Sequence, residues 1–370
     1  MAKPAEAPER KTVNLALQGG GTHGAFTWGV LDRLLEDGRL AIEAISGSSA
    51  GAINAAVLAQ GYRQGGAAGA RAELDRFWHR LSELGWLSPV HRGVLERALG
   101  TWNIDDSPAA IITDQLSRVI SPYQANPLNF SPLRDLLGSM LDVEALTAPD
   151  GIKLFVTATN VRTGKPRIFE RPDLSLDALL ASSCLPQVFQ AVVIEGEAYW
   201  DGGYMGNPSL WPLIYGCASR DVVIVQINPL TRPGVPHTAA EIMNRLNEIT
   251  FNASLLRELR AIDFVERLIA SDGSHPQVGR LKKMLIHMIE AEHAMEALGV
   301  ASKLNTDLDF LLYLKGLGRR TAETWLERHF AAVNHHSRID VRKGLPLASS
   351  RYRLRRFHAI DAAWGRHQST

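Results

Sequence analysis

The hydrophobic pattern of the first sixty residues repeats one unit twice. Residues 13–17 (VNLAL) and 42–46 (IEAIS) are short apolar runs that predict buried strands. Each run is followed by a glycine-containing turn and then by a stretch, 25–38 or 50–61, whose apolar and small residues predict a helix. Gly38 stands where it can end the first helix. Two strand–turn–helix units in succession indicate a parallel α/β core.

Later apolar runs add strands to that core. Residues 153–161, 167–169, 191–200 and 221–230 each predict a strand. The run at 221–230 is almost unbroken in its apolar character, which is typical of a central parallel strand. We therefore expect a sheet that is mostly parallel.

After Pro236 the pattern becomes helical. Residues 238–241 (TAAE) have the sequence of a capping box ahead of a long helical stretch. Residues 305–318 and 319–333 predict two further helices, and 283–290 is a candidate for one more strand.

These patterns predict a domain organisation. Residues 1–11 are expected to form a disordered lead-in, and residues 12–230 an α/β core. Proline, glycine and aromatic residues interrupt the regular pattern at about 62–150, so we expect an inserted helical and loop region there. Residues 231–345 are expected to form a mostly helical extension, followed by a basic tail at 346–370.

Composition narrows the function classes. Hydrophobic residues make up 45% of the chain and charged residues 21%, and the net charge of +1 does not favour nucleic acid as a partner. Cys184 and Cys217 are too few for a disulfide framework and lack metal-ligand spacing, so we expect them to be reduced and buried, as in a cytosolic protein. The first twelve residues lack the apolar core of a signal peptide, and no apolar run is long enough to cross a bilayer. Any contact with membranes or lipid granules is therefore expected to be peripheral.

The C-terminal region is strongly basic. Four acidic residues stand there against a set of lysine and arginine residues: Arg319, Arg320, Arg328, Arg338, Arg342, Lys343, Arg351, Arg353, Arg355, Arg356 and Arg366. A solvated face or tail is the simplest interpretation. Transient contact with an anionic membrane surface is the alternative.

A glycine loop follows the first predicted strand. Gly19, Gly21 and Gly24 have the spacing G-x-G-x-x-G between a strand and a helix. That spacing fits a dinucleotide site with the pyrophosphate at the helix N-terminus, in which Glu43 would be the acid that binds the ribose. It also fits a set of backbone N–H groups that stabilise the oxyanion of an acyl-transfer reaction. A purely structural turn is less favoured because adjacent glycines carry a high conformational entropy.

The second predicted strand leads directly into Gly47-Ser48-Ser49-Ala50-Gly51 and then into a helix. Strand, sharp turn and helix around G-x-S-x-G are the context of a nucleophile elbow. Ser49 is the central residue of the motif and the candidate nucleophile, whereas Ser48 is expected to support the turn. This second motif favours acyl transfer over nucleotide binding.

A serine nucleophile requires a base. The order Ser49, Asp201, His237 would match a Ser-Asp-His triad, but His237 lies in a proline-rich linker at a predicted helix start. Asp201 follows a predicted strand and precedes Gly202 and Gly203, so it can act directly on the serine if burial raises its pKa. A turn aspartate in a D-G-G sequence is the structural alternative.

Together these motifs resemble the patatin-like phospholipase family. The resemblance covers roughly residues 12–230 and is carried by the glycine loop, the elbow with its continuation AINAA, residues 183–190 (SCLPQVFQ), and the DGG motif with the GNPSL that follows it. It implies a three-layer α/β/α sandwich with a mostly parallel central sheet. The helical region after residue 238 resembles an extension found in some bacterial members.

The resemblance also implies a function and a site. It implies a lipid acyl-ester hydrolase of the phospholipase A or lysophospholipase kind, with Ser49 as the nucleophile and Asp201 as the base. The backbone N–H groups of Gly19, Gly20 and Gly21 would form the oxyanion hole, and no metal or organic cofactor is implied. The supporting glycines of the three motifs are Gly24, Gly47, Gly51, Gly202 and Gly203.

One position departs from the family pattern. The family often has arginine where this chain has His23, so a permanent charge near the oxyanion loop is replaced by a titratable one. We hypothesise that His23 weakens anion support at high pH or alters head-group preference.

Two other function classes stay open on the sequence. A binding or regulatory protein on the same scaffold is one, although nucleophile, base and glycine loop are all present. A dinucleotide-binding enzyme is the other. The apolar residues of the insertion, Trp86, Leu87, Trp102 and Ile104, are expected in the core rather than along an acyl channel or lipid interface.

Overall fold

The computed structural model describes residues 10–87, 102, 104–105, 107, 111–112, 115–116, 119–271, 281–340 and 345–346. Most of the expected lead-in and nearly all of the expected basic tail lie outside these residues, as do the side chains of Trp86 and Leu87.

An eight-stranded mixed sheet forms the centre of the molecule. Its strand order is β5-β6-β3-β2-β1-β7-β8, with β4 also paired to β3. The strands β1, β2, β3, β7 and β8 are parallel, β4 and β6 are antiparallel to β3, and β5 is antiparallel to β6. The strand bounds are β1 Lys11–Leu17, β2 Leu40–Ser48, β3 Lys153–Asn160, β4 Pro166–Phe169, β5 Val192–Ile194, β6 Glu197–Asp201, β7 Asp221–Gln226 and β8 Leu285–Glu290. A separate two-stranded sheet joins β9 Ile339–Asp340 to β10 Leu345–Pro346.

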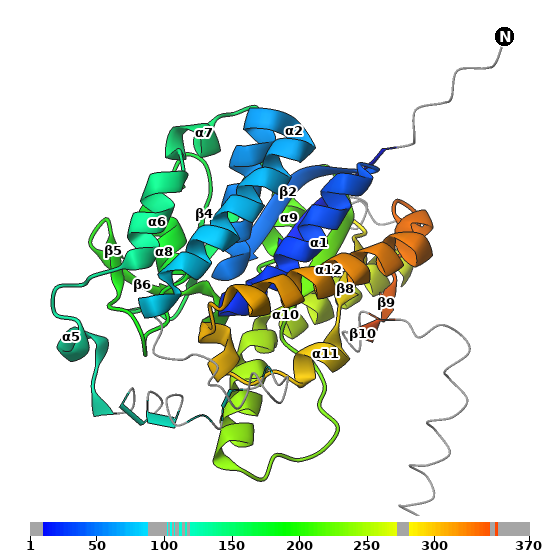
Figure 1. Cartoon of the computed structure of the whole chain (residues 1–370). Coiled ribbons are helices and arrows are strands. Elements are labelled where there is room, and N and C mark those ends of the chain that lie inside the picture. Colours follow the sequence, from blue (N-terminus) through cyan, green and yellow to red (C-terminus); the bar gives the residue numbers. More distant parts are fainter. Residues whose placement is uncertain are drawn as a thin grey trace, which may run out of the picture.

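Helices pack on both faces of the sheet (Figure 1). Their bounds are α1 Gly24–Asp37, α2 Ala50–Glu83, α5 Pro122–Ala125, α6 Pro132–Met140, α7 Val143–Thr147, α8 Leu176–Ser182, α9 Trp211–Gly216, α10 Ala239–Ser271, α11 Glu292–Glu296 and α12 Leu308–His329. Short 3₁₀ turns include η1 Gly21–His23, η3 Gly202–Tyr204 and η5 Ala301–Leu304.

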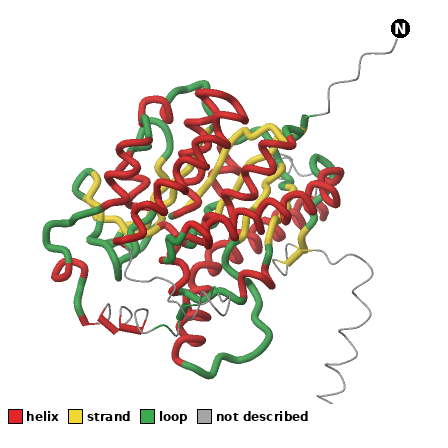
Figure 2. Tube along the Cα trace, in the orientation of Figure 1, coloured by secondary structure: helices red, strands yellow, loops and turns green. Residues whose placement is uncertain are grey.

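Alternate residues of the central strands point into two separate cores. Val13 and Leu15 of β1 pack with α1, α2 and α12 on one face of the sheet. Ala16 of β1 and Ile224 of β7 pack with α9 and α10 on the other face. The strands accordingly run between two sets of helices, as Figure 2 shows. The expected α/β fold with three layers and a mostly parallel sheet is therefore confirmed.

Most of the predicted elements are present. The strands expected at 13–17, 42–46, 153–161 and 167–169 correspond to β1 to β4. The apolar run at 221–230 contains β7, which lies between the parallel strands β1 and β8 as expected of a central strand. The candidate strand at 283–290 corresponds to β8.

The predicted helix ends are also present. The N–H of Gly38 donates to Leu34 O from a left-handed conformation. The capping box forms at the start of α10, where the N–H of Thr238 donates to a Glu241 carboxylate oxygen at 3.0 Å and the N–H of Glu241 donates to Thr238 Oγ1 at 3.2 Å.

Three element predictions were wrong, each for a local reason. The single strand expected at 191–200 is the hairpin β5–β6, because Glu195 and Gly196 both have positive φ and form a two-residue turn. The helix expected at 50–61 continues through a kink at two glycines to Glu83. Its second half carries buried Phe77 and Trp78 into the main core, although this stretch has the composition of an insertion.

The third error concerns the C-terminal helices. The two helices expected at 305–318 and 319–333 form one continuous helix, α12. Gly318 does not break it but lets it approach α1, since a Cβ there would lie 2.1 Å from Phe26 O. The helical C-terminal region is thus part of the same body: α12 lies beside α1 in Figure 1, and β8 extends the main sheet.

Candidate active site

The glycine loop and the serine turn lie side by side at the carboxyl edge of the parallel strands. Leu17, the last residue of β1, is in register with Gly47 of β2, so the two loops leave the sheet next to each other. A Cβ on Gly19 would lie 2.6 Å from Ser49 Cβ. The carboxyl edge is where α/β sheets place their ligands.

Ser49 occupies a strained turn between strand and helix. The strand β2 ends at Ser48 and α2 begins at Ala50, and Ser49 between them has φ 54° and ψ −129°. A non-glycine residue adopts this conformation only when its surroundings impose it. Ser182 Oγ accepts the Ser49 N–H at 2.9 Å, and the Ser48 hydroxyl donates to Gly206 O. Ser48 supports the turn, as expected, and Ser49 presents its side chain beside the glycine loop.

Asp201 reaches the same edge by a route that the sequence did not predict. Its strand, β6, is antiparallel to β3, whereas the mostly parallel sheet expected from the sequence would have Asp201 at the end of a parallel strand. The carboxyl edge is reached nonetheless, because Asp201 pairs with Ala158, two residues before the end of β3. Its main chain is fixed at both sides: the N–H donates to Cys184 O at 2.8 Å, and the carbonyl accepts from Thr159 Oγ1 at 2.8 Å.

The Asp201 carboxyl is fully buried. Its Oδ1 accepts the Gly203 N–H at 2.7 Å, while Oδ2 has no hydrogen-bond partner of ordinary geometry among the described residues. Burial raises the pKa of Asp201 to about 7, and the Gly203 N–H, the Ser49 hydroxyl and the charge of Lys303 partly offset that rise. The effect of the Ser49 hydroxyl on this pKa places nucleophile candidate and base candidate next to each other.

Histidine plays no corresponding part among the described residues. His237 is exposed at the start of α10, where its backbone N–H donates to Glu241 at 2.8 Å. The described side chains include no histidine that is hydrogen-bonded to Ser49 or Asp201. The arrangement therefore favours a two-residue pair over a triad.

Within the glycine loop, one of the three expected donors is already used. The Gly19 N–H donates to Asn207 Oδ1 at 2.6 Å. In contrast, the N–H groups of Gly20 and Gly21 make no hydrogen bond within the described part of the chain. The Gly19 N–H, expected as an oxyanion donor, is therefore already committed to Asn207, whereas those of Gly20 and Gly21 remain candidates for that role.

The supporting glycines lie where the backbone is too crowded for a side chain. An added Cβ would come within 1.9 to 2.8 Å of a neighbouring atom at each of Gly24, Gly47, Gly51, Gly202 and Gly203. At Gly51 that atom is Leu17 O, and at Gly202 it is Thr157 O. The three motifs are thus packed directly against the ends of β1 and β3.

Behind the loop lies a buried amide network that the sequence did not single out. Gln18 Oε1 accepts the N–H groups of Ile227 and Asn228 at 2.8 and 2.9 Å, and Gln18 Nε2 donates to Asn252 Oδ1 at 3.0 Å. Asn228 Nδ2 in turn donates to Gly19 O at 3.0 Å. Their positions could have indicated this network, because Gln18 directly follows β1 and Asn228 comes two residues after β7.

His23 is not the titratable charge that the sequence suggested. Its side chain is buried, with Nε2 2.7 Å from Ser302 Oγ. Burial, together with the positive charge of Lys303, holds the pKa of His23 well below its usual range. His23 is therefore neutral at and above neutral pH, and the hypothesis that it loses charge at high pH is wrong.

The acid required for a dinucleotide site is engaged elsewhere. Glu43 accepts the N–H groups of Ala218 and Ser219 at 2.8 and 2.7 Å and pairs with Lys153 at 3.1 Å. Ser219 Oγ donates to Thr12 O near the start of β1, so Glu43 lies at the opposite edge of the sheet from the glycine loop. This position removes the support for a ribose-binding role.

The other sequence expectations have mixed outcomes. Both cysteines are free, and Cys184 is buried as expected, but Cys217 is only partly buried. Ile104 is buried, and Trp102 is partly buried against Phe310 and Tyr313. Among the described residues, no three His, Cys, Asp or Glu side chains are grouped closely enough to hold a metal ion.

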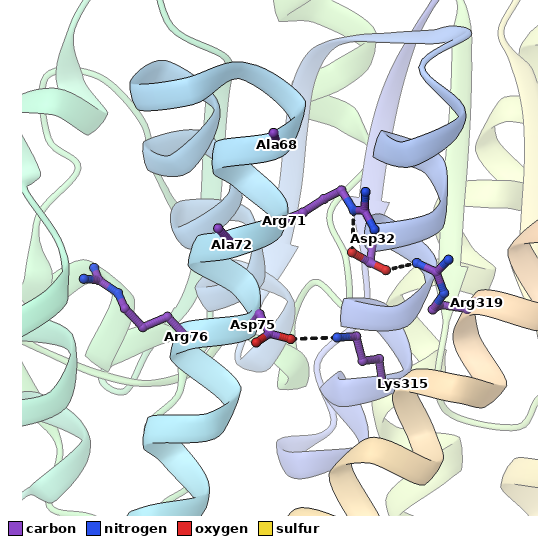
Figure 3. A pocket seen from close by; sticks show the side chains of 8 residues that line it. All are labelled: Asp32, Ala68, Arg71, Ala72, Asp75, Arg76, Lys315 and Arg319. Carbon is purple, nitrogen blue, oxygen red and sulfur yellow. Dashed lines mark hydrogen bonds and ion pairs between the residues drawn. The ribbon is translucent and has the colours of Figure 1, made fainter.

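A separate cavity of about 620 Å³ lies between α1, α2 and α12 (Figure 3), and its lining includes neither Ser49 nor Asp201. Charged side chains that pair with one another line much of it. Asp32 pairs with Arg71 at 2.7 Å and with Arg319, and Asp75 pairs with Lys315 at 2.7 Å. We do not assign the catalytic site to this cavity, because its lining contains no strained or unpaired group.

None of the described helices combines the length and apolar character needed to cross a membrane.

Two solved structures resemble the chain weakly. VipD from Legionella pneumophila is 16% identical, with 85% of this chain and 72% of that chain covered and a TM-score of 0.33. ExoU in the heterodimeric ExoU–SpcU complex from the type III secretion system of Pseudomonas aeruginosa is 18% identical, with a TM-score of 0.29. That match covers 83% of this chain but only 52% of the other.

The low TM-scores mean that neither structure adds to the case for an activity. A search of curated proteins finds no match. The family comparison is decisive, because the model described as patatin-like phospholipase matches residues 15–214. That span is more than half of the chain and includes the glycine loop, the serine turn and the Asp-Gly-Gly motif. The chain therefore belongs to the patatin-like phospholipase family.

Proposed function

We propose that the protein hydrolyses acyl esters of lipids, in the manner of a phospholipase A or a lysophospholipase, through an acyl-enzyme on Ser49. Membership of a lipid-hydrolase family supports the substrate class. The single observation that carries the mechanism is the pairing of a strained Ser49 with a buried Asp201, whose Oδ2 has no other partner among the described residues. No separate observation favours a non-catalytic role.

In the first half of the reaction, Ser49 Oγ forms a bond to the ester carbonyl carbon and its proton passes to Asp201 Oδ2. The carbonyl electron pair moves to the oxygen, and the N–H groups of Gly20 and Gly21 stabilise the resulting oxyanion. When the oxyanion collapses, the bond to the alcohol breaks. The alcohol leaves with the proton from Asp201, and the acyl group remains on Ser49.

In the second half, Asp201 accepts a proton from water as the water oxygen attacks the acyl carbon. The bond to Ser49 Oγ then breaks, and Ser49 recovers the proton from Asp201. A carboxylate whose pKa lies near 7 suits both directions of transfer, because it is ionised in much of the protein at neutral pH yet holds a proton better than an ordinary aspartate.

A membrane role forms a further part of the proposal. The substrate class requires the protein to meet lipid, and the basic C-terminal region is the segment that we propose contacts an anionic surface. Arg319 of this region is already engaged with Asp32 and Glu36. The contact is therefore assigned to the basic residues beyond α12.

Labelling with a fluorescent alkyl fluorophosphonate tests the mechanism. The wild-type protein and His237→Ala should react, whereas Ser49→Ala and Asp201→Asn should not. His237→Ala is the matched control, since His237 is the exposed alternative base. Labelling that survives Ser49→Ala would contradict the assignment of the nucleophile, and labelling that is lost in His237→Ala would restore the triad.

A panel of radiolabelled phospholipids, lysophospholipids and acylglycerols then tests the substrate class. We expect release of free fatty acid from at least one lipid by the wild-type protein and none by Ser49→Ala. A wild-type protein that labels with fluorophosphonate but releases no fatty acid from any lipid would contradict a lipid substrate while leaving the serine nucleophile intact.

A further inference from the structure

Lys303 is the most unusual charged residue near the site. It lies in η5, which packs against the glycine loop: a Cβ on Gly21 would lie 2.3 Å from Lys303 O, and Thr22 Oγ1 donates to Ser302 O at 2.9 Å. Its ammonium makes no ion pair among the described residues. Two amide oxygens hold it instead, Asn228 Oδ1 at 2.9 Å and Asn247 Oδ1 at 2.7 Å.

The bond to Asn228 begins a continuous chain of hydrogen bonds. Lys303 Nζ donates to Asn228 Oδ1, and the same amide group donates through Nδ2 to Gly19 O at 3.0 Å. The Gly19 carbonyl and the Gly20 N–H belong to one peptide unit. A charge at Lys303 therefore polarises first the Asn228 amide and then the peptide unit that carries the Gly20 N–H.

The carboxylates nearest to Lys303 are bound by other residues, so its ammonium is not neutralised by an ion pair among the described residues. Glu248 on α10 is paired with Arg232 at 2.6 Å and with Arg245 at 3.2 Å. Asp105 accepts from Asn244 at 2.6 Å and from the Ala301 N–H at 2.8 Å. The remaining titratable neighbours are His23 of η1, which is neutral, and Asp201 of β6.

Lys303 also contacts the aspartate motif through an aromatic ring. Its Nζ lies 5.5 Å from the centroid of the Phe251 ring, and a Cβ on Gly203 would meet that ring at 2.4 Å. The Lys303 side chain is thus linked to the glycine loop through Asn228 and to the Asp-Gly-Gly turn through Phe251.

We propose that Lys303 is a positioning residue that strengthens the oxyanion hole: its ammonium, acting through Asn228 and the Gly19–Gly20 peptide, makes the Gly20 N–H a better donor to the developing oxyanion. The inference rests on the proposed acyl-transfer function and adds a residue of the C-terminal region to it. Lys303 touches neither substrate nor nucleophile. Its effect should appear in the transition state, where the negative charge develops, and not in substrate binding.

The Lys303 ammonium is desolvated by its surroundings, so the proposed effect should itself depend on pH. Desolvation lowers the pKa of Lys303 to about 8, despite the opposing charges of Glu248 and Asp201. As pH rises through that value, Lys303 loses its charge and the Gly20 N–H becomes a weaker donor. The same loss removes one of the influences that keep Asp201 ionised.

The test measures kcat and KM for a soluble chromogenic ester between pH 5.5 and 10. For the wild-type protein we expect kcat/KM to rise on an acidic limb through the Asp201 pKa, and then to fall about tenfold on an alkaline limb near pH 8 to a lower plateau, because the oxyanion hole is weakened but not lost. In Lys303→Met, kcat should fall by about tenfold, less than the loss of a direct oxyanion donor, with KM little changed. The alkaline limb near pH 8 should disappear, and the acidic limb should move to higher pH.

Two further variants separate charge from packing. Lys303→Arg keeps a charge that does not titrate in this range, so it should restore most of kcat and move the alkaline limb to higher pH. Lys282→Met is the matched control, because Lys282 Nζ is likewise bound to an uncharged acceptor, Cys217 O at 2.6 Å, at the amino end of the strands. It should leave both limbs in place.

These variants test the role of Lys303 separately from the proposed acyl-transfer function. An unchanged pH profile in Lys303→Met, or a profile of Lys303→Arg that keeps the wild-type alkaline limb, would overturn the role of Lys303. If Lys303→Met does not fold, the Arg variant still decides. Failure of the proposed function would be seen in a different experiment, because Ser49 of the wild-type protein would not react with fluorophosphonate.

Discussion

Charged side chains gather in two regions of the described structure that differ in how the charges are compensated. Between α1, α2 and α12, Asp32 is paired with Arg71 and Arg319, and Asp75 is paired with Lys315 (Figure 3). At the carboxyl edge of the sheet, Asp201 Oδ2 has no hydrogen-bond partner among the described residues, and the hydrogen bonds of the Lys303 ammonium go to amide oxygens rather than to a carboxylate.

This difference distinguishes charges that hold helices together from charges that we propose take part in the reaction. A paired charge between helices fixes how they pack and contributes modestly to stability. An uncompensated buried charge destabilises the fold, and such groups with shifted pKa values tend to cluster where a reaction uses them. The strained Ser49 and the Asp201 oxygen that has no hydrogen-bond partner of ordinary geometry among the described residues lie next to each other. The predictions below test this division from its strongest consequence to its weakest.

Replacing Asp201 by Asn should have the largest effect. We expect kcat/KM to fall on the order of 10³ to 10⁴, by analogy with the loss of other catalytic carboxylates and bases. The fold should survive. Because the pKa of Asp201 is about 7 in the folded protein and about 4 in the unfolded chain, the free energy of unfolding should fall as pH rises from about 4 to about 7. At pH 8 that loss is complete, so Asp201→Asn should unfold at higher denaturant than the wild type.

Esterase kinetics and urea unfolding on the same preparation would check both statements. A variant that retains activity within tenfold of wild type would remove Asp201 from the mechanism. A variant that is inactive and also less stable than the wild type at pH 8 would instead make Asp201 a structural residue.

The next largest change in rate should come from lowering the pH of the wild-type protein. The base must be ionised to accept the Ser49 proton, so kcat/KM should decrease about tenfold per pH unit below the Asp201 pKa of about 7. Between pH 7 and pH 5 the loss should be on the order of a hundredfold. An acidic limb near pH 4, the value of an ordinary aspartate, would show that Asp201 is not the base or is not buried during catalysis.

Gly51→Ala should destabilise the turn at the carboxyl edge of the sheet without replacing a proposed catalytic group. Alanine favours helices, but here its Cβ would lie 2.3 Å from Leu17 O, so we expect a loss of about 1 to 3 kcal/mol in the free energy of unfolding. Gly138→Ala is the matched control. Gly138 lies in α6 with its nearest neighbour at 3.5 Å, so this substitution should stabilise by about 1 kcal/mol. Equal effects at the two sites in chemical denaturation would contradict the crowding at the elbow.

The smallest effect is expected in the charged cavity. Arg71→Met removes a half-exposed partner of Asp32 but leaves Arg319 in place, so stability should change by less than about 1 kcal/mol and kcat/KM should stay at the wild-type value. A rate loss above tenfold would mean that this cavity takes part in the reaction, and the comparison between the two charged regions would fail.

The sequence predicted the mostly parallel α/β core and the three motifs because both depend on local patterns, whereas the three layers were implied by the family resemblance. Apolar runs mark the strands whatever their partners, and Ser49 and Asp201 stand in short stretches with recognisable glycines. Strand direction was not local: the antiparallel course of β6 depends on a turn at Glu195 and Gly196 that the apolar run concealed. The long helix α2 was likewise concealed by glycines that kink it without ending it.

The rest of the site depends on contacts between distant segments. Lys303 reaches the glycine loop only because η5 packs against η1, and no pattern in either segment announces that contact. The commitment of the Gly19 N–H to Asn207 is of the same kind. Sequence patterns therefore identified the groups proposed to react, while the groups that tune them became visible only in three dimensions.

The most direct test of the central claim is to trap the acyl-enzyme. The protein would be mixed with a slowly hydrolysed acyl ester and quenched in acid within the first turnover, and its peptides would be mapped by mass spectrometry. The account predicts an acyl group on the peptide that contains Ser49, absent from Ser49→Ala. Turnover of the ester at the wild-type rate by Ser49→Ala, or an acyl group found only on another residue, would contradict it.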